Sequence, residues 1–222
     1  MEKLTLSKVV LSDLKRLVDL REEVGTQHSW IAVDSIQLHE NERRQLEDIR
    51  LRFINTQVHL FNEATIWSRV IYPLLLLAEK EDIQIWAEVP LKARYAQFEV
   101  EGVADGVLGK SVAGRIETPY LVMVETKRGI EGENPVFQLY GQLLAAARLN
   151  WENDRQEPQE IFGGYTIADS WTFVRGEVSA IETDRPCLKV EFSREYTEKT
   201  EIDMLLKILK SIVARHLGTA IK

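Results

Sequence analysis

The spacing of apolar residues changes along this 222-residue chain, and that change limits the fold more than any other feature. Up to about residue 80, apolar residues recur every three or four positions, which is typical of amphipathic helices. From Ile83 they alternate with polar residues, which is typical of strands with one buried face. Helical spacing returns after Asn134 and after Thr200. The pattern predicts an α/β fold with a mixed central β-sheet flanked by helices and an N-terminal helical segment.

Start and stop signals define the expected elements. Ser12, Asn62 and Thr200 are helix caps, and Asn134 with Pro135 opens a further helix. We expect a kink near residue 73, where a proline falls inside a helix. The chain is expected to divide into a helical accessory segment at 1–58 and a second domain at 59–222. The expected helices cover 12–24, 39–55, 62–80, 134–150 and 201–217, and the expected strands cover 83–93, 97–108, 120–127, 161–167, 171–174 and 188–192, with a loop at 109–119.

Charge and cysteine content exclude some classes of protein. The chain has 28 basic and 35 acidic residues, a net charge of −7, which argues against non-specific coating of nucleic acid. Its single cysteine, Cys187, allows no internal disulfide and no cysteine-based zinc site. The longest apolar stretch, Val70–Ala78, is far shorter than the ~20 residues that span a bilayer. No secretory signal is visible, so we expect a cytoplasmic protein without a membrane partner.

Three residues suggest chemistry. In the expected strand at 120–127, Glu125 and Lys127 lie two positions apart and share a face. Asp105 lies in the preceding strand and can sit opposite or diagonal to Glu125 if the two strands form a hairpin. Two carboxylates and a backbone carbonyl make the oxygen cage that Mg²⁺ accepts, and a lysine beside it can hold a water and stabilise charge on a phosphate.

Asp105 and the triplet Glu125-Thr126-Lys127 resemble the PD-(D/E)XK nuclease superfamily, which has the restriction-endonuclease-like fold. The resemblance implies a Mg²⁺-dependent nuclease that hydrolyses DNA phosphodiester bonds, with Mn²⁺ as a substitute. It assigns the metal to Asp105, Glu125 and the main-chain carbonyl of Thr126, and the positioning of the attacking water to Lys127. Ala104 stands where the name-giving pattern has proline.

Two flanking helices extend the resemblance, which covers about residues 63–150. Glu63 opens the helix before the strands and implies a role through a metal-bound water or a second ion. Gln138, with Gln142 as the substitute, lies on the following helix and is expected to steady the lysine or contact the backbone phosphate. DNA is the implied partner, RNA stays open, and a homodimer is an oligomer that the family allows.

Simpler interpretations stay open for each residue. Glu63 can merely complement a helix dipole, and an isolated pair such as Glu125 and Lys127 is more often an ordinary surface pair. Asp105 precedes a glycine, which is also a turn signal, although the apolar residues on either side argue against a turn. The alternative function is a non-catalytic nucleic-acid-binding or regulatory protein that keeps the nuclease fold.

Histidines and tryptophans are expected to play structural parts. The four histidines lack the spacing of metal ligands. The five tryptophans are scattered, so we expect core or surface anchors and no platform for stacking bases.

Overall fold

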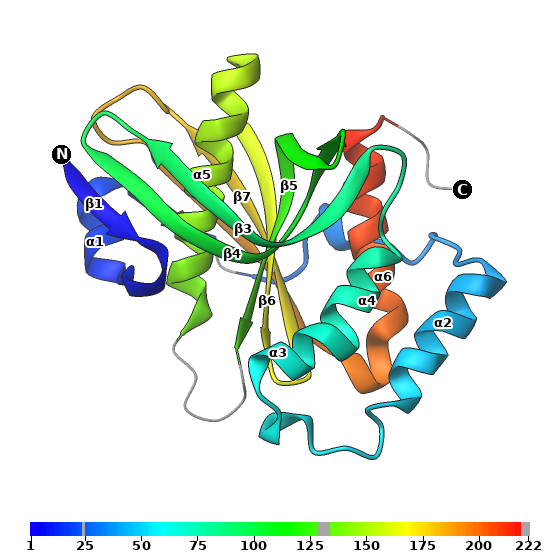
Figure 1. Cartoon of the computed structure of the whole chain (residues 1–222). Helices are drawn as coiled ribbons and strands as arrows, with labels where there is room; N and C mark the ends of the chain where they lie inside the picture. The colour runs from blue at the N-terminus through cyan, green and yellow to red at the C-terminus, as the bar shows by residue number, and fades with distance from the viewer. Residues whose placement is uncertain (24, 128–133, 219–222) are drawn as a thin grey trace.

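The computed structural model describes residues 1–23, 25–127 and 134–218. A strongly twisted sheet of eight strands crosses the middle of the molecule (Figure 1). Helices α1 and α5 cover one face, and α2, α3, α4 and α6 gather on the other side. The prediction of an α/β fold with a mixed sheet flanked by helices is therefore confirmed.

The elements have the following bounds. The strands are β1 (Glu2–Thr5), β2 (Asp19–Glu22), β3 (Ile83–Arg94), β4 (Phe98–Val112), β5 (Arg115–Lys127), β6 (Gln159–Ile167), β7 (Ser170–Ser179) and β8 (Cys187–Thr197). The α-helices are α1 (Leu11–Leu17), α2 (Glu40–Leu51), α3 (Glu63–Ile66), α4 (Tyr72–Leu76), α5 (Pro135–Asp154) and α6 (Glu198–His216). Short 3₁₀ turns lie at Leu6–Lys8, Ser29–Ile31 and Val58–Leu60, and a π-helical turn lies at Trp67–Ile71.

The strands pair in the order β1-β4-β5-β6-β7-β8-β2, and β3 pairs with β4 outside this path. Three pairs are parallel: β1 with β4, β5 with β6, and β2 with β8. The other pairs are antiparallel. Helix α5 connects the parallel strands β5 and β6 and packs on both of them, as a crossover helix does.

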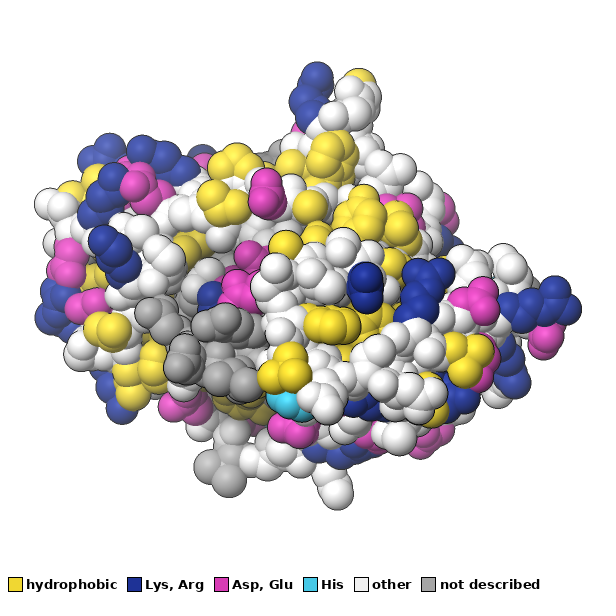
Figure 2. All heavy atoms as spheres, turned by 60° about the horizontal axis from the view of Figure 1, so that its bottom comes forward, with side chains coloured by type: hydrophobic (Ala, Val, Ile, Leu, Met, Phe, Trp, Pro, Cys, Tyr) yellow, Lys and Arg dark blue, Asp and Glu magenta, His cyan; other side chains and the backbone are white. Residues whose placement is uncertain are grey.

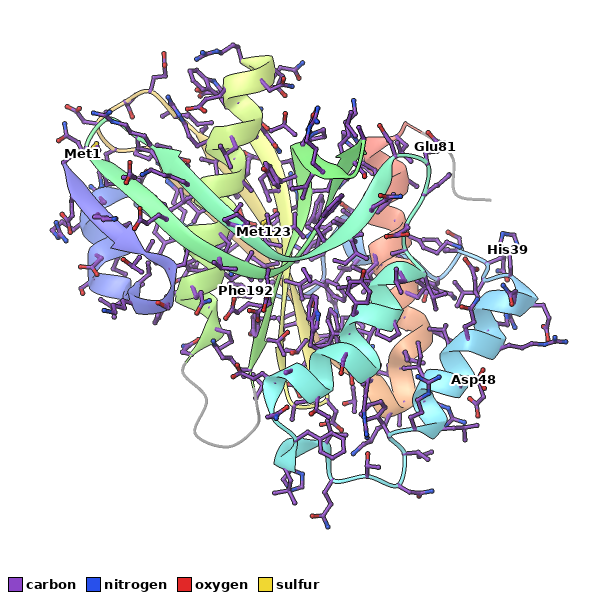
Figure 3. All side chains as sticks on the ribbon, viewed as in Figure 1. Met1, His39, Asp48, Glu81, Met123 and Phe192 are labelled. Carbon is purple, nitrogen blue, oxygen red and sulfur yellow. The ribbon has the colours of Figure 1, made fainter. Side chains whose placement is uncertain are left out.

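The N-terminal segment differs from the expectation. The first helix ends at Leu17 and not near Gly25, and the chain continues directly into β2. The expected helical accessory segment 1–58 therefore supplies two strands, β1 and β2, that pair with β4 and β8 at the two ends of the strand order. In Figure 3, Met1 lies at one side of the molecule, and His39, which caps α2, and Asp48 on α2 lie at the other. Strands of four residues are too short to show a period in the sequence.

The expected kink at Pro73 takes the form of a π-helical turn. Asn62 caps the helix as predicted, with its side chain accepting a hydrogen bond from the Thr65 N–H at 2.8 Å. After α3 the helix widens, and the Tyr72 N–H donates to the carbonyl of Trp67 five residues earlier. Proline has no N–H and clashes with the carbonyl of the preceding turn, so a wider turn just before Pro73 accommodates it.

The expected loop at 109–119 is also different. Strands β4 and β5 continue through it and meet in a two-residue turn at Ala113 and Gly114, with Val112 paired to Arg115. Both turn residues have positive φ, of 49° and 78°, which is the geometry of hairpin turns that follow the natural twist of strands. Asp105 is a strand residue, so the turn interpretation of Asp105 is wrong.

Strand β3 changes the face that it buries at Glu88. Ile83 and Ile85 pack in the core beside α4 and α6, whereas Val89 and Leu91 pack in the core beside α5. All four have odd numbers and would share one face of a regular strand. Glu88 has a φ of 51° and interrupts the alternation between them. The interruption lies where β3 runs alongside the part of β4 that contains Asp105.

In the part of the chain that the structure describes, none of the helices combines the length and the apolar character needed to cross a membrane.

Candidate active site

Asp105 and Thr126 join the strands that carry the predicted site. Gly106 of β4 pairs with Val124 of β5, so Asp105 lies beside the end of β5. The Thr126 N–H donates to Oδ2 of Asp105 at 2.7 Å. Burial raises the pKa of Asp105, although this hydrogen bond and the ammonium of Lys127 oppose the rise. Asp105 is half-buried and has one oxygen fixed by the backbone.

Glu125 is fully buried and is held from two sides. The Nζ atom of Lys127 lies 2.8 Å from its Oε1 atom, and the Nε2 atom of Gln142 donates to its Oε2 atom at 2.6 Å. Burial raises the pKa of Glu125 to about 7, and the nearby carboxylate of Asp105 adds to the rise. Lys127 and Gln142 oppose it. This carboxyl group therefore changes its charge close to neutral pH.

Lys127 keeps its charge in this environment. Burial disfavours the ammonium, but the ion pair with Glu125, together with Glu63 and Asp105, outweighs burial and raises the pKa of Lys127. Its side chain is 17% exposed and its ammonium contacts Glu125. An ammonium next to two carboxylates is suited to hold a water or a phosphate oxygen.

Glu63 joins the group from the start of α3. It is exposed and lines a cavity together with Asp105 and Thr126. Its charge raises the pKa of both Asp105 and Lys127, which shows that it acts on the same group electrostatically. The structure therefore brings Glu63, Asp105, Glu125 and Lys127 into one region from three elements.

Gln138 and Gln142 have different surroundings. Gln142 is fully buried and contacts Glu125 directly. Gln138 is half-buried, and no hydrogen bond from it to another described residue is present. The structure places the substitute candidate, Gln142, and not Gln138, in contact with the site. One helical turn separates the two, and only the rotation of α5 against the sheet distinguishes them.

A cavity of about 370 Å³ opens beside Asp105. Figure 2 shows the face of the molecule that is turned downward in Figure 1, with acidic side chains beside the grey atoms near the middle of the face and hydrophobic side chains next to them. The cavity is lined by Glu63, Ala64, Trp67, Ala87, Glu88, Asp105 and Thr126.

Sequence reasoning missed two of these residues. Glu88 adds a third carboxylate to the cavity, and its charge raises the pKa of Asp105. In the sequence, Glu88 resembles any solvent-facing strand residue between apolar neighbours. Nothing in that pattern indicates its left-handed φ, which the structure shows. Trp67 is only partly buried and lines the cavity. The expectation that all five tryptophans are anchors is therefore incomplete for Trp67.

A different cluster gathers metal-ligating atoms most tightly. Among the residues that the structure describes, Glu23, His28 and Glu191 form the one group of three such side chains whose ligand atoms all lie within 4.8 Å of one another. Cations already contact its carboxylates, with Lys189 at 2.6 Å from Glu23 and Arg175 at 3.2 Å from Glu191. These ion pairs leave little uncompensated charge for a metal. The oxygens of Glu63, Asp105 and Glu125 are less tightly gathered.

In comparisons with known proteins, no family model matches the chain, and no curated protein is significantly similar to it.

Proposed function

We propose that the chain is a Mg²⁺-dependent nuclease that hydrolyses DNA phosphodiester bonds and has a restriction-endonuclease-like fold. One observation carries the proposal: Asp105, Glu125 and Lys127 converge from adjacent strands, and Glu125 is held between Lys127 at 2.8 Å and Gln142 at 2.6 Å. A buried carboxylate with a pKa near 7, beside a lysine and a second carboxylate, is costly to maintain. Such perturbed groups are typical of active sites, and the neighbouring Asp105 and Thr126 line the cavity.

The donor set fits a hard cation. The carboxylates of Asp105 and Glu125 and the carbonyl of Thr126 would hold Mg²⁺, which prefers oxygen ligands. When bound, the ion supplies neutralising charge and lowers the pKa of a bound water. Lys127 orients a water and stabilises charge on the phosphate, because it carries a positive charge beside both carboxylates. Gln142 orients Glu125, and Glu63 contributes through a water at the rim of the cavity.

Cleavage assays with variants of the site test the proposal. Purified protein is incubated with plasmid DNA, duplex and single-stranded oligonucleotides, and RNA, in Mg²⁺ or Mn²⁺, with a chelator as the blank. Cleavage should fall at least ~100-fold in Asp105→Asn and in Lys127→Met. The first substitution removes the negative charge of a proposed metal ligand, and the second removes the positive charge that would stabilise the phosphate. Lys110→Met is the control, because this lysine pairs with Asp82 at 3.8 Å outside the cavity. Activity that survives both site substitutions contradicts the proposal.

A second candidate is a non-catalytic protein that binds nucleic acid or regulates a partner. The observation that favours it is that both oxygens of Glu125 are already engaged, one by Lys127 and one by Gln142. This candidate predicts no cleavage of any substrate and no heat of Mn²⁺ binding in calorimetry. The nuclease predicts Mn²⁺ binding that Asp105→Asn abolishes.

A further inference from the structure

The cavity beside Asp105 is lined by both apolar and acidic side chains. Trp67, Ala64 and Ala87 are the apolar ones, and Glu63, Glu88 and Asp105, here called the acidic rim, are the charged ones. At about 370 Å³, the cavity falls in the ~300–1,000 Å³ range of small-molecule sites, which combine apolar walls with a few polar groups.

Contacts with β4 and with a neighbouring tyrosine fix the position of the Trp67 indole. A Cβ atom added to Gly106 of β4 would lie 2.2 Å from the Cη2 atom of the indole, so only glycine allows this approach. Tyr72 packs on the indole from the same helix, with ring centroids 6.0 Å apart and planes tilted by 52°. Trp67 also opens the π-helical turn, a distortion that is frequent at functional sites. The indole is therefore held in place and still lines open space.

Thr126 contributes a polar group without a partner. The residue is 1% exposed, and its hydroxyl oxygen forms no hydrogen bond with any residue that the structure describes. Val122 and Val124, which share its face of β5, pack in the same core as the helix that carries Trp67. The hydroxyl therefore lies on the side of the sheet where the cavity opens. A buried hydroxyl without a partner is costly, which points to a ligand or water that satisfies it.

The acidic side chains of the cavity limit which ligands can bind in it. Glu63 and Glu88 leave negative charge in the cavity even when Asp105 holds a cation, so they disfavour a phosphate beside them, whereas a flat neutral ring is not repelled. Carboxylates only accept hydrogen bonds, so they favour a ring that carries an amino group. Adenine, cytosine and guanine carry such groups, and every base can stack on an indole.

We propose that this cavity binds one unpaired nucleobase, stacked on Trp67 and hydrogen-bonded through its amino group to the acidic rim. The inference rests on the proposed function for its choice of nucleic acid as the ligand. A base inside a duplex has to be unpaired and extruded to reach the cavity, which costs free energy that an unpaired base does not require. The preferred substrate is therefore single-stranded, or a duplex with an unpaired nucleotide at the cleavage position.

Binding measured without cleavage tests this pocket. The probes are a fluorescein-labelled 12-nucleotide DNA strand, its blunt duplex, and the same strand with one 2-aminopurine, all in Ca²⁺. The single strand should bind at least ~10-fold more tightly than the duplex, and (dC)12 more tightly than (dT)12. The 2-aminopurine fluorescence should fall on binding, because stacking quenches it.

Two substitutions at one position separate stacking from volume. Trp67→Phe keeps an aromatic face and should bind the strand within ~3-fold of the natural protein. Trp67→Leu keeps apolar volume but loses the face, and its affinity should fall ~5- to 150-fold, the range of one base stacked on an aromatic ring. Thermal melting checks that each variant is folded. Equal binding of strand and duplex, a reversed order of (dC)12 and (dT)12, or unchanged affinity in Trp67→Leu overturns the pocket.

The two proposals fail in different ways. Cleavage that survives Asp105→Asn and Lys127→Met removes the nuclease assignment, whatever Trp67 does. Cleavage that is lost in those variants, while Trp67→Leu binds the strand normally, leaves the nuclease in place and removes the base pocket.

Discussion

Glu125 makes the affinity of the site for a divalent cation depend on pH. Its pKa of about 7 means that the neutral acid predominates below pH 7, and a metal ligand has to be the carboxylate. The affinity for Mn²⁺ should therefore rise about tenfold per pH unit up to about pH 7 and level off above it. Calorimetric titration between pH 5.5 and 8.5 measures this. An affinity that is constant below pH 7 contradicts it.

Gln142 lowers the pKa of Glu125 by donating a hydrogen bond to it. Gln142→Leu removes the donor, so the midpoint of the pH profile for Mn²⁺ binding should move to higher pH. Gln138→Leu is the matched control, one turn away on the same helix, because the described polar partners of Glu125 are Lys127 and Gln142. Equal shifts in the two variants would show that the position on α5, and not the hydrogen bond, controls the carboxyl group.

Glu198 should make the stability of the fold fall as the pH rises. It is 3% exposed and accepts a hydrogen bond from the indole N–H of Trp171, while its second oxygen has no hydrogen-bond partner in the described part of the chain. Burial raises its pKa from 4.5 to about 8. Because the pKa of Glu198 is higher in the folded state than in the unfolded chain, its contribution to the free energy of unfolding is complete below pH 4.5 and is lost as the pH rises through about 8. The free energy of unfolding falls by about 5 kcal/mol across this range.

The substitution Glu198→Gln isolates this effect. Glutamine keeps the acceptor for Trp171 and cannot ionise, so its melting temperature should fall less between pH 5 and 8.5 than that of the natural protein. Asp203→Asn, on the exposed side of the same helix, should leave the slope unchanged. Thermal melting followed by circular dichroism across this pH range gives both slopes, and parallel slopes in Glu198→Gln and the natural protein contradict the argument.

At the scale of the residue, the sequence predicts some neighbours and not others. Glu125 and Lys127 share a face because strands alternate with a period of two, so their contact was accessible from spacing alone. The choice of Gln142 over Gln138 depends on how α5 is rotated against the sheet, which tertiary packing decides. Glu88 reaches the cavity because of its left-handed φ, and no local pattern indicates that conformation.

At the scale of the element, the contact between β4 and the helix that carries Trp67 sets the shape of the cavity. Gly106→Ala places a methyl group against the indole and should destabilise the fold by about 1–3 kcal/mol. Adding Trp67→Leu should recover most of that loss, because the smaller side chain frees the space. Gly164→Ala on β6 is the control, since its Cβ would meet other atoms no closer than 3.6 Å. Urea unfolding of the natural protein, Gly106→Ala, Trp67→Leu and the double variant gives the coupling energy between the two positions. Additive losses of stability contradict the contact.

Long periodic runs followed the sequence, but only two of the four expected caps did. The caps expected at Ser12 and Thr200 are wrong, because α1 begins at Leu11 after Val10 and α6 begins at Glu198 after Thr197. Asn62 and Asn134 cap helices in the structure as predicted, each accepting a backbone hydrogen bond. Helix α5 runs past the expected end at residue 150 and stops at Asp154, where Arg155 adopts a left-handed conformation that a sequence with arginine does not suggest. Strands β1 and β2 were missed because each depends on a partner strand far along the chain.

At the scale of the whole molecule, Leu6 joins the N-terminal segment to the rest of the fold. It is 1% exposed and lies against Gly102 of β4 and Gly141 of α5, where added Cβ atoms would come within 2.7 Å of it. Leu6→Ala should cost about 2–5 kcal/mol, because it leaves a cavity between the sheet and α5. Val10→Ala, at a position 48% exposed, should change stability by less than ~0.5 kcal/mol. Denaturant unfolding measures both, and a small loss in Leu6→Ala would favour the separate accessory segment.

The candidate catalytic residues lie close together in the sequence, whereas some paired strands of the sheet lie far apart in it. The candidate catalytic residues come from one stretch, Glu63 to Gln142, so they are synthesised together. Strand β2 is made long before its partner, because Asp19 pairs with Cys187, 168 residues further along the chain. Such contacts between distant residues slow folding, and unpaired strand edges promote aggregation. A nascent chain that has just completed α5 therefore carries every candidate catalytic group on a sheet that has yet to gain β6, β7 and β8, and β2 waits without a partner until β8 is made.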